Sequence, residues 1–285
     1  MIDEILFSRH ATIPAEKGWS LFSVKVDERG SAYALIGDAN ENQRGHQPTR
    51  YRLLDLDRSE TVFETIPMRA RLWSGQPLGE GFLLQGVAPF GDLAGGSCVV
   101  DARGAVQRTL DLGVGIEDVQ IAGNEIWVSY FDEGVFSKRG EPGLACFDWT
   151  GTRTFSFREI EITGPESLVP DIADCYALNV TAPGDVWLYY YTEFPLIHLR
   201  GRNVAGSWMP TPVVGAQAVA VREPYVVFLG DYGSSSSALR YDLRTRAVTE
   251  LRSVNDGGVE LNGRRSARGA RTYVVEHDAL WVAEV

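Results

Sequence analysis

The chain has 285 residues, of which 44% are hydrophobic, with 30 Gly and 13 Pro; this composition argues against intrinsic disorder and fits an all-β protein. Its net charge of −11 at pH 7 excludes a nucleic-acid backbone as the main partner, because phosphate binding requires clustered Lys and Arg. The first residues lack a basic start followed by a long apolar core, and no apolar run could span a bilayer. We therefore expect a soluble, cytoplasmic protein with no membrane partner.

One turn pattern recurs at a nearly fixed interval. An Asp separates an apolar run from a second strand-like run at Asp55, Asp101, Asp148 and Asp242. The steps between these residues are 46, 47 and 94, and 94 is twice 47; a further unit centred on 199–201 fills the double gap. About six such units fill the chain, which predicts an all-β fold, a six-bladed β-propeller of four-stranded antiparallel sheets.

The third unit shows the strand pattern best. It contains the short runs EDVQIAG, EIWVSYF, GLACFDW and RTFSFREI, separated by Gly, Asn and Asp turns. The second unit is the least regular, because its many glycines blur the strand boundaries, and it is assigned by spacing. Trp127, Trp187 and Trp281 are expected at one place in the second strand of their units, where large side chains fill the space between sheets.

The last unit is incomplete at the C-terminus. Residues 270–285 supply two strands, and the strand-like stretch at 3–9 has no partner nearby in the sequence. We expect this N-terminal strand to complete the last blade and close the ring, which removes two exposed sheet edges. The whole chain then forms one domain without a linker. Its blades are expected at residues 17–66, 67–113, 114–163, 168–213, 214–254, and 263–285 plus 1–15.

In repeat length and strand pattern the chain resembles six-bladed propellers of the broad group that includes senescence marker protein/gluconolactonase, NHL-repeat and strictosidine-synthase-like proteins. The resemblance extends over nearly the whole chain. For lactonase-like members it implies a divalent cation near the channel, held by a Glu at the first inner strand and by Asn and Asp from others. This chain departs from that pattern: its first inner strand begins GWSLFSVKV without a Glu, no PNG step opens an inner strand, and Thr192 stands where an acidic ligand is expected.

In a propeller, one face is built from the loops that enter each innermost strand and the loops that leave each second strand. Polar groups from these loops are expected to converge on the mouth of the central channel, where they could bind a ligand. Three of these loops, 37–50, 131–143 and 230–238, are longer than a tight hairpin needs, so they either carry binding or are surface insertions. The channel-mouth candidates are Glu117, Asp118, Tyr130, Asp132, Asp171, Asp174, Tyr190, Glu193, Asp231, Arg268, Arg271 and His46.

A cation site is one interpretation of the acids. Oxygen ligands gathered from adjacent blades suit Ca²⁺ or Mg²⁺, and the candidates are Glu117, Asp118, Asp171 and Asp174. The alternative is that these acids pair with Arg268 and Arg271 across the channel, since a buried charge must be paired.

Two tyrosines and one histidine have two interpretations each. Tyr130 and Tyr190 stand at the same offset from Trp127 and Trp187, so they either line an aromatic pocket for a small organic ligand or sugar, or pack between blades with their hydroxyls bonded to the backbone. His46 lies in a long loop that could reach the channel mouth and act in acid–base chemistry. The three cysteines have no CxxC spacing and are expected to be buried, reduced thiols.

The leading functional hypothesis is a propeller that binds a protein or small-molecule partner on its loop face. The alternative is an enzyme at the channel mouth, either a metal-assisted hydrolase or lactonase, or an acid–base enzyme that uses a carboxyl group of raised pKa.

Overall fold

The computed structural model describes residues 3–38, 50–65, 71–86, 96–160, 169–234 and 236–285. The described residues form β-strands and turns with one helix of four residues, α1 (Asp132–Val135), and one 3₁₀ turn at Phe157–Glu159. No helix in these ranges has the length and apolar character needed to cross a membrane. His46 lies outside the described residues.

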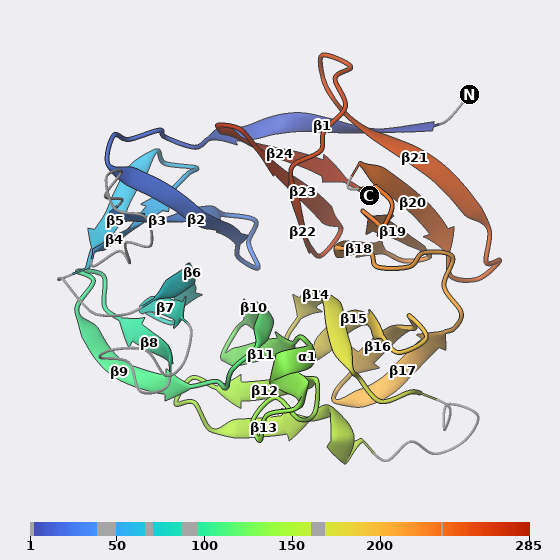
Figure 1. Cartoon of the computed structure of the whole chain (residues 1–285), viewed down its shortest axis with the longest axis horizontal. Helices are drawn as coiled ribbons and strands as arrows, with labels where there is room; N and C mark the ends of the chain where they lie inside the picture. Colours follow the sequence, from blue (N-terminus) through green and yellow to red (C-terminus); the bar gives the residue numbers. More distant parts are fainter. Residues whose placement is uncertain (1–2, 39–49, 66–70, 87–95, 161–168, 235) are drawn as a thin grey trace.

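The strands form small antiparallel sheets arranged as a ring around a central channel (Figure 1). Four of the sheets have four strands each, and a fifth has eight strands and contains two further groups of four. We call each group a blade and number the blades along the chain. This arrangement confirms the predicted all-β propeller fold built from four-stranded antiparallel sheets.

The first strand of each blade is innermost, and the others follow outward. Blade 1 comprises β2 (Trp19–Val26), β3 (Ala32–Asp38), β4 (Tyr51–Asp55) and β5 (Glu60–Glu64). Blade 2 comprises β6 (Leu72–Leu78), β7 (Gly81–Gly86), β8 (Gly96–Val100) and β9 (Val106–Asp111). Blade 3 comprises β10 (Ile116–Ala122), β11 (Glu125–Tyr130), β12 (Leu144–Asp148) and β13 (Arg153–Ser156).

The remaining blades follow the same order except at the end of the ring. Blade 4 comprises β14 (Asp174–Ala182), β15 (Asp185–Tyr191), β16 (Leu196–Arg200) and β17 (Asn203–Trp208). Blade 5 comprises β18 (Ala218–Arg222), β19 (Tyr225–Leu229), β20 (Ser237–Asp242) and β21 (Val248–Asn255). Blade 6 comprises β22 (Arg264–Arg268), β23 (Arg271–Glu276), β24 (Ala279–Glu284) and the N-terminal strand β1 (Asp3–Thr12).

The N-terminal strand closes the ring, as predicted. Its second half pairs antiparallel with β24, from Ser8 opposite Val282 to Thr12 opposite Ala279. Its first half pairs parallel with β21 of blade 5, which the sequence did not predict. Because β1 joins both neighbours, the eight strands of blades 5 and 6 form one continuous sheet.

Blade 6 differs from the prediction in one further respect. The C-terminal part of the chain supplies three strands rather than two, because Arg264–Arg268 forms the innermost one. Trp281 therefore lies in the third strand of its blade, and not in the second strand beside Trp127 and Trp187. Its spacing of 94 residues from Trp187 is a coincidence of numbering.

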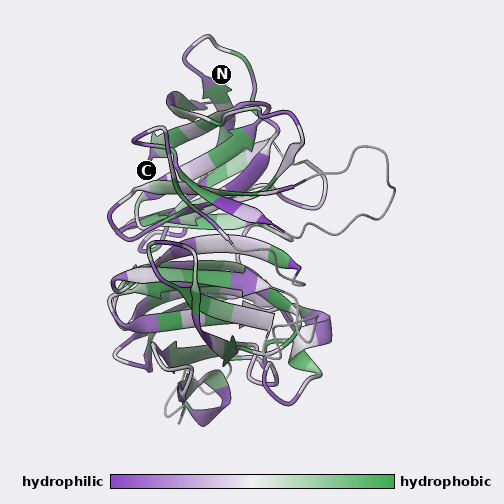
Figure 2. Cartoon of the chain, turned by 90° about the vertical axis from the view of Figure 1, so that its left-hand side faces the viewer, coloured by the Kyte–Doolittle hydropathy of each residue, from purple (hydrophilic) through white to green (hydrophobic). Residues whose placement is uncertain are grey.

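Large side chains between neighbouring blades form the core. Seen from the side, the strands carry hydrophobic stretches interrupted by hydrophilic ones (Figure 2). Middle strands such as β8, β11 and β12 are buried along almost their whole length, as expected for sheets that are covered on both faces. Trp127 packs among buried residues of blades 3 and 4, and Trp187 among those of blades 4 and 5. The three cysteines are free and buried, as predicted; burial raises the pKa of Cys98 to about 12 and that of Cys146 to about 11.

Four inner strands share one irregularity close to their start. Near the start of the inner strand, the register between the first and second strand shifts in each of blades 1 to 4, so that an extra residue bulges from the inner strand; blade 4 has a second shift near the end of its inner strand. Such a bulge redirects the side chain of the extra residue. The four bulge residues are Phe22, Trp73, Glu117 and Tyr176. The corresponding pairs of blades 5 and 6 have no shift.

Candidate functional site

A cavity of about 370 Å³ lies at the mouth of the channel, on the face predicted to carry function. We call this cavity the channel pocket, and this face the upper face. Five of the inner strands or their preceding residues contribute to its lining. The polar residues that line it are Ser23, Lys25, Glu117, Asp118, Tyr176, Gln217, Arg264, Arg265 and Ser266.

Buried side chains close the channel below this pocket. Gln120 Nε2 of β10 donates to the carbonyl of Leu178 in blade 4 at 2.7 Å, and its Oε1 accepts from Val180 N at 2.9 Å and from Arg268 Nη1 of blade 6 at 2.8 Å. Arg268 Nη2 also donates to the carbonyl of Ile121. These bonds join three blades across the channel, so the channel pocket has a floor.

Asp118 has a structural role in the wall of the pocket. It forms an ion pair with Lys25 of blade 1. It also accepts hydrogen bonds from Val119 N at 2.8 Å and from Gln120 Nε2 at 3.0 Å. These contacts satisfy the carboxylate and fix it to the floor.

The neighbouring Glu117 has no such partners. Its side chain reaches the solvent of the cavity and makes no hydrogen bond with the described residues. Although this side chain is exposed to the cavity, the surrounding protein atoms displace part of its water, and together with the negative charges of Asp118 and Asp174 this raises the pKa of Glu117 to about 7, while Lys25 acts in the opposite direction. A carboxyl group with a pKa near neutrality can both donate and accept a proton, so Glu117 is the most chemically adaptable group of this pocket.

A second cavity, of about 580 Å³, lies beside the channel pocket over blades 1 to 3. The two cavities share Ser23, Lys25 and Glu117 in their linings. We call the second one the aromatic pocket, because Phe22, Trp73 and Phe131 line it.

On the other side of the channel pocket, aromatic rings form a rim. Tyr176 contacts Phe194 at 5.7 Å and Tyr232 at 5.8 Å between ring centroids. The hydroxyls of Tyr176 and Tyr232 are hydrogen-bonded to each other, which joins blade 4 to blade 5. Burial and this hydrogen bond raise the pKa of Tyr176, so it remains a neutral hydroxyl that faces the pocket.

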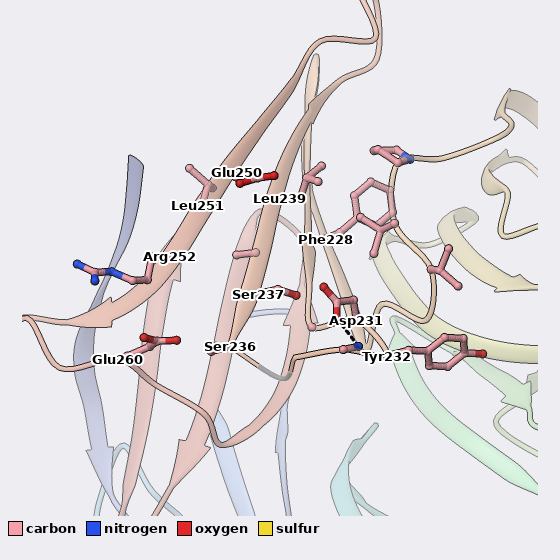
Figure 3. A pocket seen from close by; sticks show the side chains of 16 residues that line it. Phe228, Asp231, Tyr232, Ser236, Ser237, Leu239, Glu250, Leu251, Arg252 and Glu260 are labelled. Atoms are coloured by element: carbon pink, nitrogen blue, oxygen red, sulfur yellow. Dashed lines mark hydrogen bonds between the residues drawn. The ribbon is translucent and has the colours of Figure 1, made fainter. Parts of the chain in front are cut away.

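A third cavity, of about 620 Å³, lies over blade 5 and away from the channel (Figure 3). The predicted site residue Asp231 lies in this third cavity. Its Oδ1 accepts from Gly233 N and Ser234 N, both at 2.6 Å, so the carboxylate holds its own loop. Tyr232 turns away from this cavity toward the neighbouring blade (Figure 3).

The structure brings four of the predicted residues close together. Glu117 and Asp118 are adjacent in the channel pocket, and Asp174 is close enough to Glu117 to raise the pKa of Glu117. The pKa of Asp174 is itself raised, first by burial and second by the negative charge of Asp132. Asp171 and Glu193 are exposed on loops and contribute to neither pocket.

The two predicted tyrosines are packing residues. Tyr130 and Tyr190 are fully buried. Their hydroxyls donate to backbone carbonyls, Tyr130 to Leu112 at 2.5 Å and Tyr190 to Pro170 at 2.7 Å. Of the two interpretations, packing between blades is therefore the one that the structure supports.

Arg268 and Arg271, which were predicted at the channel mouth, lie at the ends of their strands that are remote from the upper face. The inner strand of blade 6 ends at Arg268 and is followed by Arg271 on the opposite face, against the turn at Gly30. Among the described residues neither arginine forms an ion pair with the acids of the mouth, and Asp118 pairs with Lys25 instead.

The residues that enter blade 6 on the upper face are Arg264 and Arg265, which sequence reasoning missed. The repeat contained a signal for them, because Gln217 enters blade 5 and 264 − 217 equals 47 residues, the length of one repeat. Lys25 and Tyr176 were also missed, since nothing local marks a lysine or tyrosine of a strand as facing the channel.

The predicted cation site remains a prediction. Within the part of the chain that the structure describes, no group of three or more His, Cys, Asp or Glu side chains is placed to hold a metal ion.

Comparisons with known proteins support the fold and say little about the site. The model of the YxzG family matches residues 144–282, just under half of the chain. No curated protein matches. Among solved structures, a chain of a mitotic checkpoint complex is similar with a TM-score of 0.55 and 8% identity, over 95% of this chain and 76% of that one. At this identity the likeness shows a β-propeller-type fold only.

Two further solved structures are more distant. BamB from Moraxella catarrhalis has a TM-score of 0.48 and 12% identity, over 100% of this chain and 92% of that one. The extracellular domain of a putative one-component system from B. thetaiotaomicron has a TM-score of 0.46 and 11% identity, over 99% of this chain and 42% of that one. The comparisons do not single out the gluconolactonase, NHL-repeat or strictosidine-synthase-like group.

Proposed function

We propose that this chain is a single-domain, ligand-binding β-propeller that holds a small polar molecule in the channel pocket. The observation that carries the proposal is a cavity that is closed at its lower end and lined by polar side chains without hydrogen-bond partners among the described residues. The floor residues satisfy one another, whereas the side chains of Glu117 and Gln217 make no hydrogen bonds with described residues. A few convergent polar groups in a preformed concave site are typical of small-molecule recognition.

The lining favours a ligand with several hydrogen-bonding groups. Glu117 supplies a carboxyl group of adjustable charge, Gln217 supplies both a donor and an acceptor, and Tyr176 supplies a hydroxyl. A volume of about 370 Å³ is at the small end of known ligand sites, so a molecule of the size of a sugar or amino acid fits better than a protein segment. A protein partner on the upper-face loops is the alternative occupant.

The test is a thermal-shift and native mass-spectrometry screen with neutral sugars, uronic acids, amino acids and small organic acids. We expect at least one compound to raise the melting temperature of the natural chain and to be detected bound. Gln217→Ala and Glu117→Gln should weaken its binding. Glu80→Gln is the matched control, because Glu80 is exposed in the turn between β6 and β7 on the opposite face. Equal binding by all variants, or no bound compound, would contradict the proposal.

An enzyme at the same pocket is the second candidate, and the raised pKa of Glu117 favours it. In this case Glu117 acts as a general acid or base, with or without a divalent cation as in lactonase-like propellers. Turnover of a lactone and ester panel that is lost in Glu117→Gln but kept in Glu80→Gln would support this function. Metal analysis of the purified protein, together with the effect of added cations on the stability of a variant with Asp171→Ala and Asp174→Ala, tests the metal-assisted form.

A further inference from the structure

The four bulge residues define a larger site than the channel pocket alone. Phe22 and Trp73 line the aromatic pocket, Tyr176 lines the channel pocket, and Glu117 lines both. The same local device, one extra residue near the start of the inner strand, thus directs one side chain from each of four adjacent blades into a connected groove. Blades 5 and 6 lack the device and line only the channel-pocket end of the groove, through residues such as Gln217 and Arg264.

The aromatic end of this groove is held in place from beneath. Phe22 packs edge-on against Trp73, with ring centroids 6.4 Å apart, and against the buried Tyr51 at 5.8 Å. The hydroxyl of Tyr51 accepts a hydrogen bond from Leu72 N at 3.1 Å, which joins blade 1 to blade 2. Trp73 itself is 41% exposed. A fixed indole ring that is open to a cavity provides a flat surface on which another ring can stack.

Unpaired cations flank the aromatic end. The guanidinium of Arg71 lies over the Trp73 ring, 4.9 Å from its centroid. Arg264 Nη1 donates to the carbonyl of Phe22 at 3.1 Å, which places this guanidinium at the boundary between the two pockets. Neither arginine forms an ion pair with a described carboxylate, whereas Lys25 is neutralised by Asp118. Glu133 also lines the aromatic pocket and forms no ion pair with the described residues, whereas Arg264 lines the channel pocket, which Glu133 does not. The guanidinium of Arg264 therefore favours an anionic group of the ligand at the boundary between the pockets.

We propose that the channel pocket and the aromatic pocket form one groove for an elongated aromatic anion, whose ring stacks on Trp73 and Phe22 and whose acidic group binds the guanidinium of Arg264. This proposal rests on the proposed function, because both use the channel pocket, and it specifies the class of ligand. The remaining polar part of the ligand extends toward Glu117, Tyr176 and Gln217. The partly protonated Glu117 lowers the repulsion that an anion meets there.

Three probes separate the ring from the charge. Indole-3-acetate carries both, indole-3-acetamide keeps the ring without the charge, and hexanoate keeps the charge without the ring. Their dissociation constants are measured by ligand-observed NMR titration against the natural chain and its variants. For the natural chain we expect indole-3-acetate to bind about tenfold more tightly than either of the other two.

Matched variants identify the groups responsible. Trp73→Ala should weaken indole-3-acetate about tenfold. Trp149→Ala is its control, because Trp149 is also exposed and also carries an arginine, Arg108, over its ring, but lies in the turn after β12 on the opposite face. Arg264→Gln should weaken indole-3-acetate about tenfold and leave indole-3-acetamide unchanged. Arg103→Gln, an exposed arginine on the opposite face, should change neither.

The outcomes distinguish this proposal from the proposed function. Hexanoate binding as tightly as indole-3-acetate, equal affinities of the Trp73 and Trp149 variants for indole-3-acetate, or no measurable binding of indole-3-acetate would overturn the aromatic-anion groove. If such a result came together with a polar compound that binds the natural chain and is lost in Gln217→Ala, the channel pocket would stand as a binding site without the aromatic extension. Loss of both would overturn both.

Discussion

The floor of the channel offers a sharp test of how this ring is held together. Gln120→Met keeps the length and approximate volume of the side chain but removes its amide. Val180 N then loses its acceptor at 2.9 Å, Leu178 O loses its donor at 2.7 Å, and Arg268 loses its contact at 2.8 Å. All of these groups are buried or nearly so, and Gln120 itself is 7% exposed.

The expected loss of stability follows from these three contacts. A buried polar group without a partner costs about 1–3 kcal/mol, and a guanidinium that loses an acceptor costs more than a neutral group. We therefore expect Gln120→Met to lower the free energy of unfolding by about 4 kcal/mol. Gln76→Met is the matched control: Gln76 is equally buried, but its only hydrogen bond in the described structure is to Val119 O at 2.9 Å, so its loss should be about 1 kcal/mol.

Equilibrium unfolding in urea, followed by circular dichroism, measures both variants under the same conditions. If the two variants lose the same stability, the assignment of Gln120 as the centre of the floor is wrong. A second comparison uses the charge of Arg268. In Gln120→Met the guanidinium of Arg268 keeps its bond to the carbonyl of Ile121 but loses its acceptor at Gln120. When Arg268→Met is added, this partly unsatisfied buried charge is removed, so the double variant should lose less stability than the sum of the two single variants.

Two further predictions concern Glu117 and ring closure. Because the pKa of Glu117 is raised from 4.5 to about 7 in the folded chain, the folded state holds this proton more tightly, and the resulting stability is present below about pH 4.5 and lost as the pH rises through about 7. The free energy of unfolding of Glu117→Gln, relative to that of the natural chain, should therefore increase by about 1 kcal/mol when the pH is raised from 5 to 8; this value is reduced for the solvent that reaches the cavity. Urea titrations at several pH values measure this difference. A difference that stays constant across the range would refute the assignment. Deletion of residues 1–9 removes the buried Phe7 and the pairing with β21. In calorimetry it should lower the midpoint temperature of the whole unfolding transition rather than fray one end of the chain. An unchanged midpoint would show that β1 does not close the ring.

The ring and the face that carries the channel pocket could be predicted because their signals are local. Asp turns at a period near 47 residues and alternating apolar residues mark strands wherever they occur. For blades 1, 3, 4 and 5 the sequence indicated residues at the start of the inner strand, and Glu117 and Asp118 were found in this way. The last blade was misassigned because its inner strand, Arg264–Arg268, contains three arginines and a single apolar residue. Its burial depends on partners in other blades, which hydrophobic periodicity does not detect.

The bulge residues were beyond prediction for a different reason. A bulge is a property of two paired strands, and the register between the two strands cannot be determined from the sequence of either strand alone. Phe22, Trp73 and Tyr176 therefore read as ordinary strand aromatics. The tyrosines that did stand out by their spacing, Tyr130 and Tyr190, are fixed by loop carbonyls that are distant in sequence.

The chemistry of the floor explains why the groups above it remain free. Gln120 and Asn179 are amides, which donate and accept at the same time without a net charge. Asn179 Nδ2 donates to Val219 O and Gly269 O, both at 2.8 Å, while its Oδ1 accepts from Gly269 N at 2.7 Å. The two amides thus join blades 3, 4, 5 and 6, and among the described residues Asp118 is the carboxylate of the mouth that they contact, through the hydrogen bond from Gln120 Nε2 at 3.0 Å. A floor built from charged pairs would need Glu117 or Asp174 as counterions, and the pocket would then lose the groups that can contact a ligand. Because the amides fix the inner strands in advance, a ligand that enters the groove meets side chains that are already in place, and little ordering free energy is lost on binding.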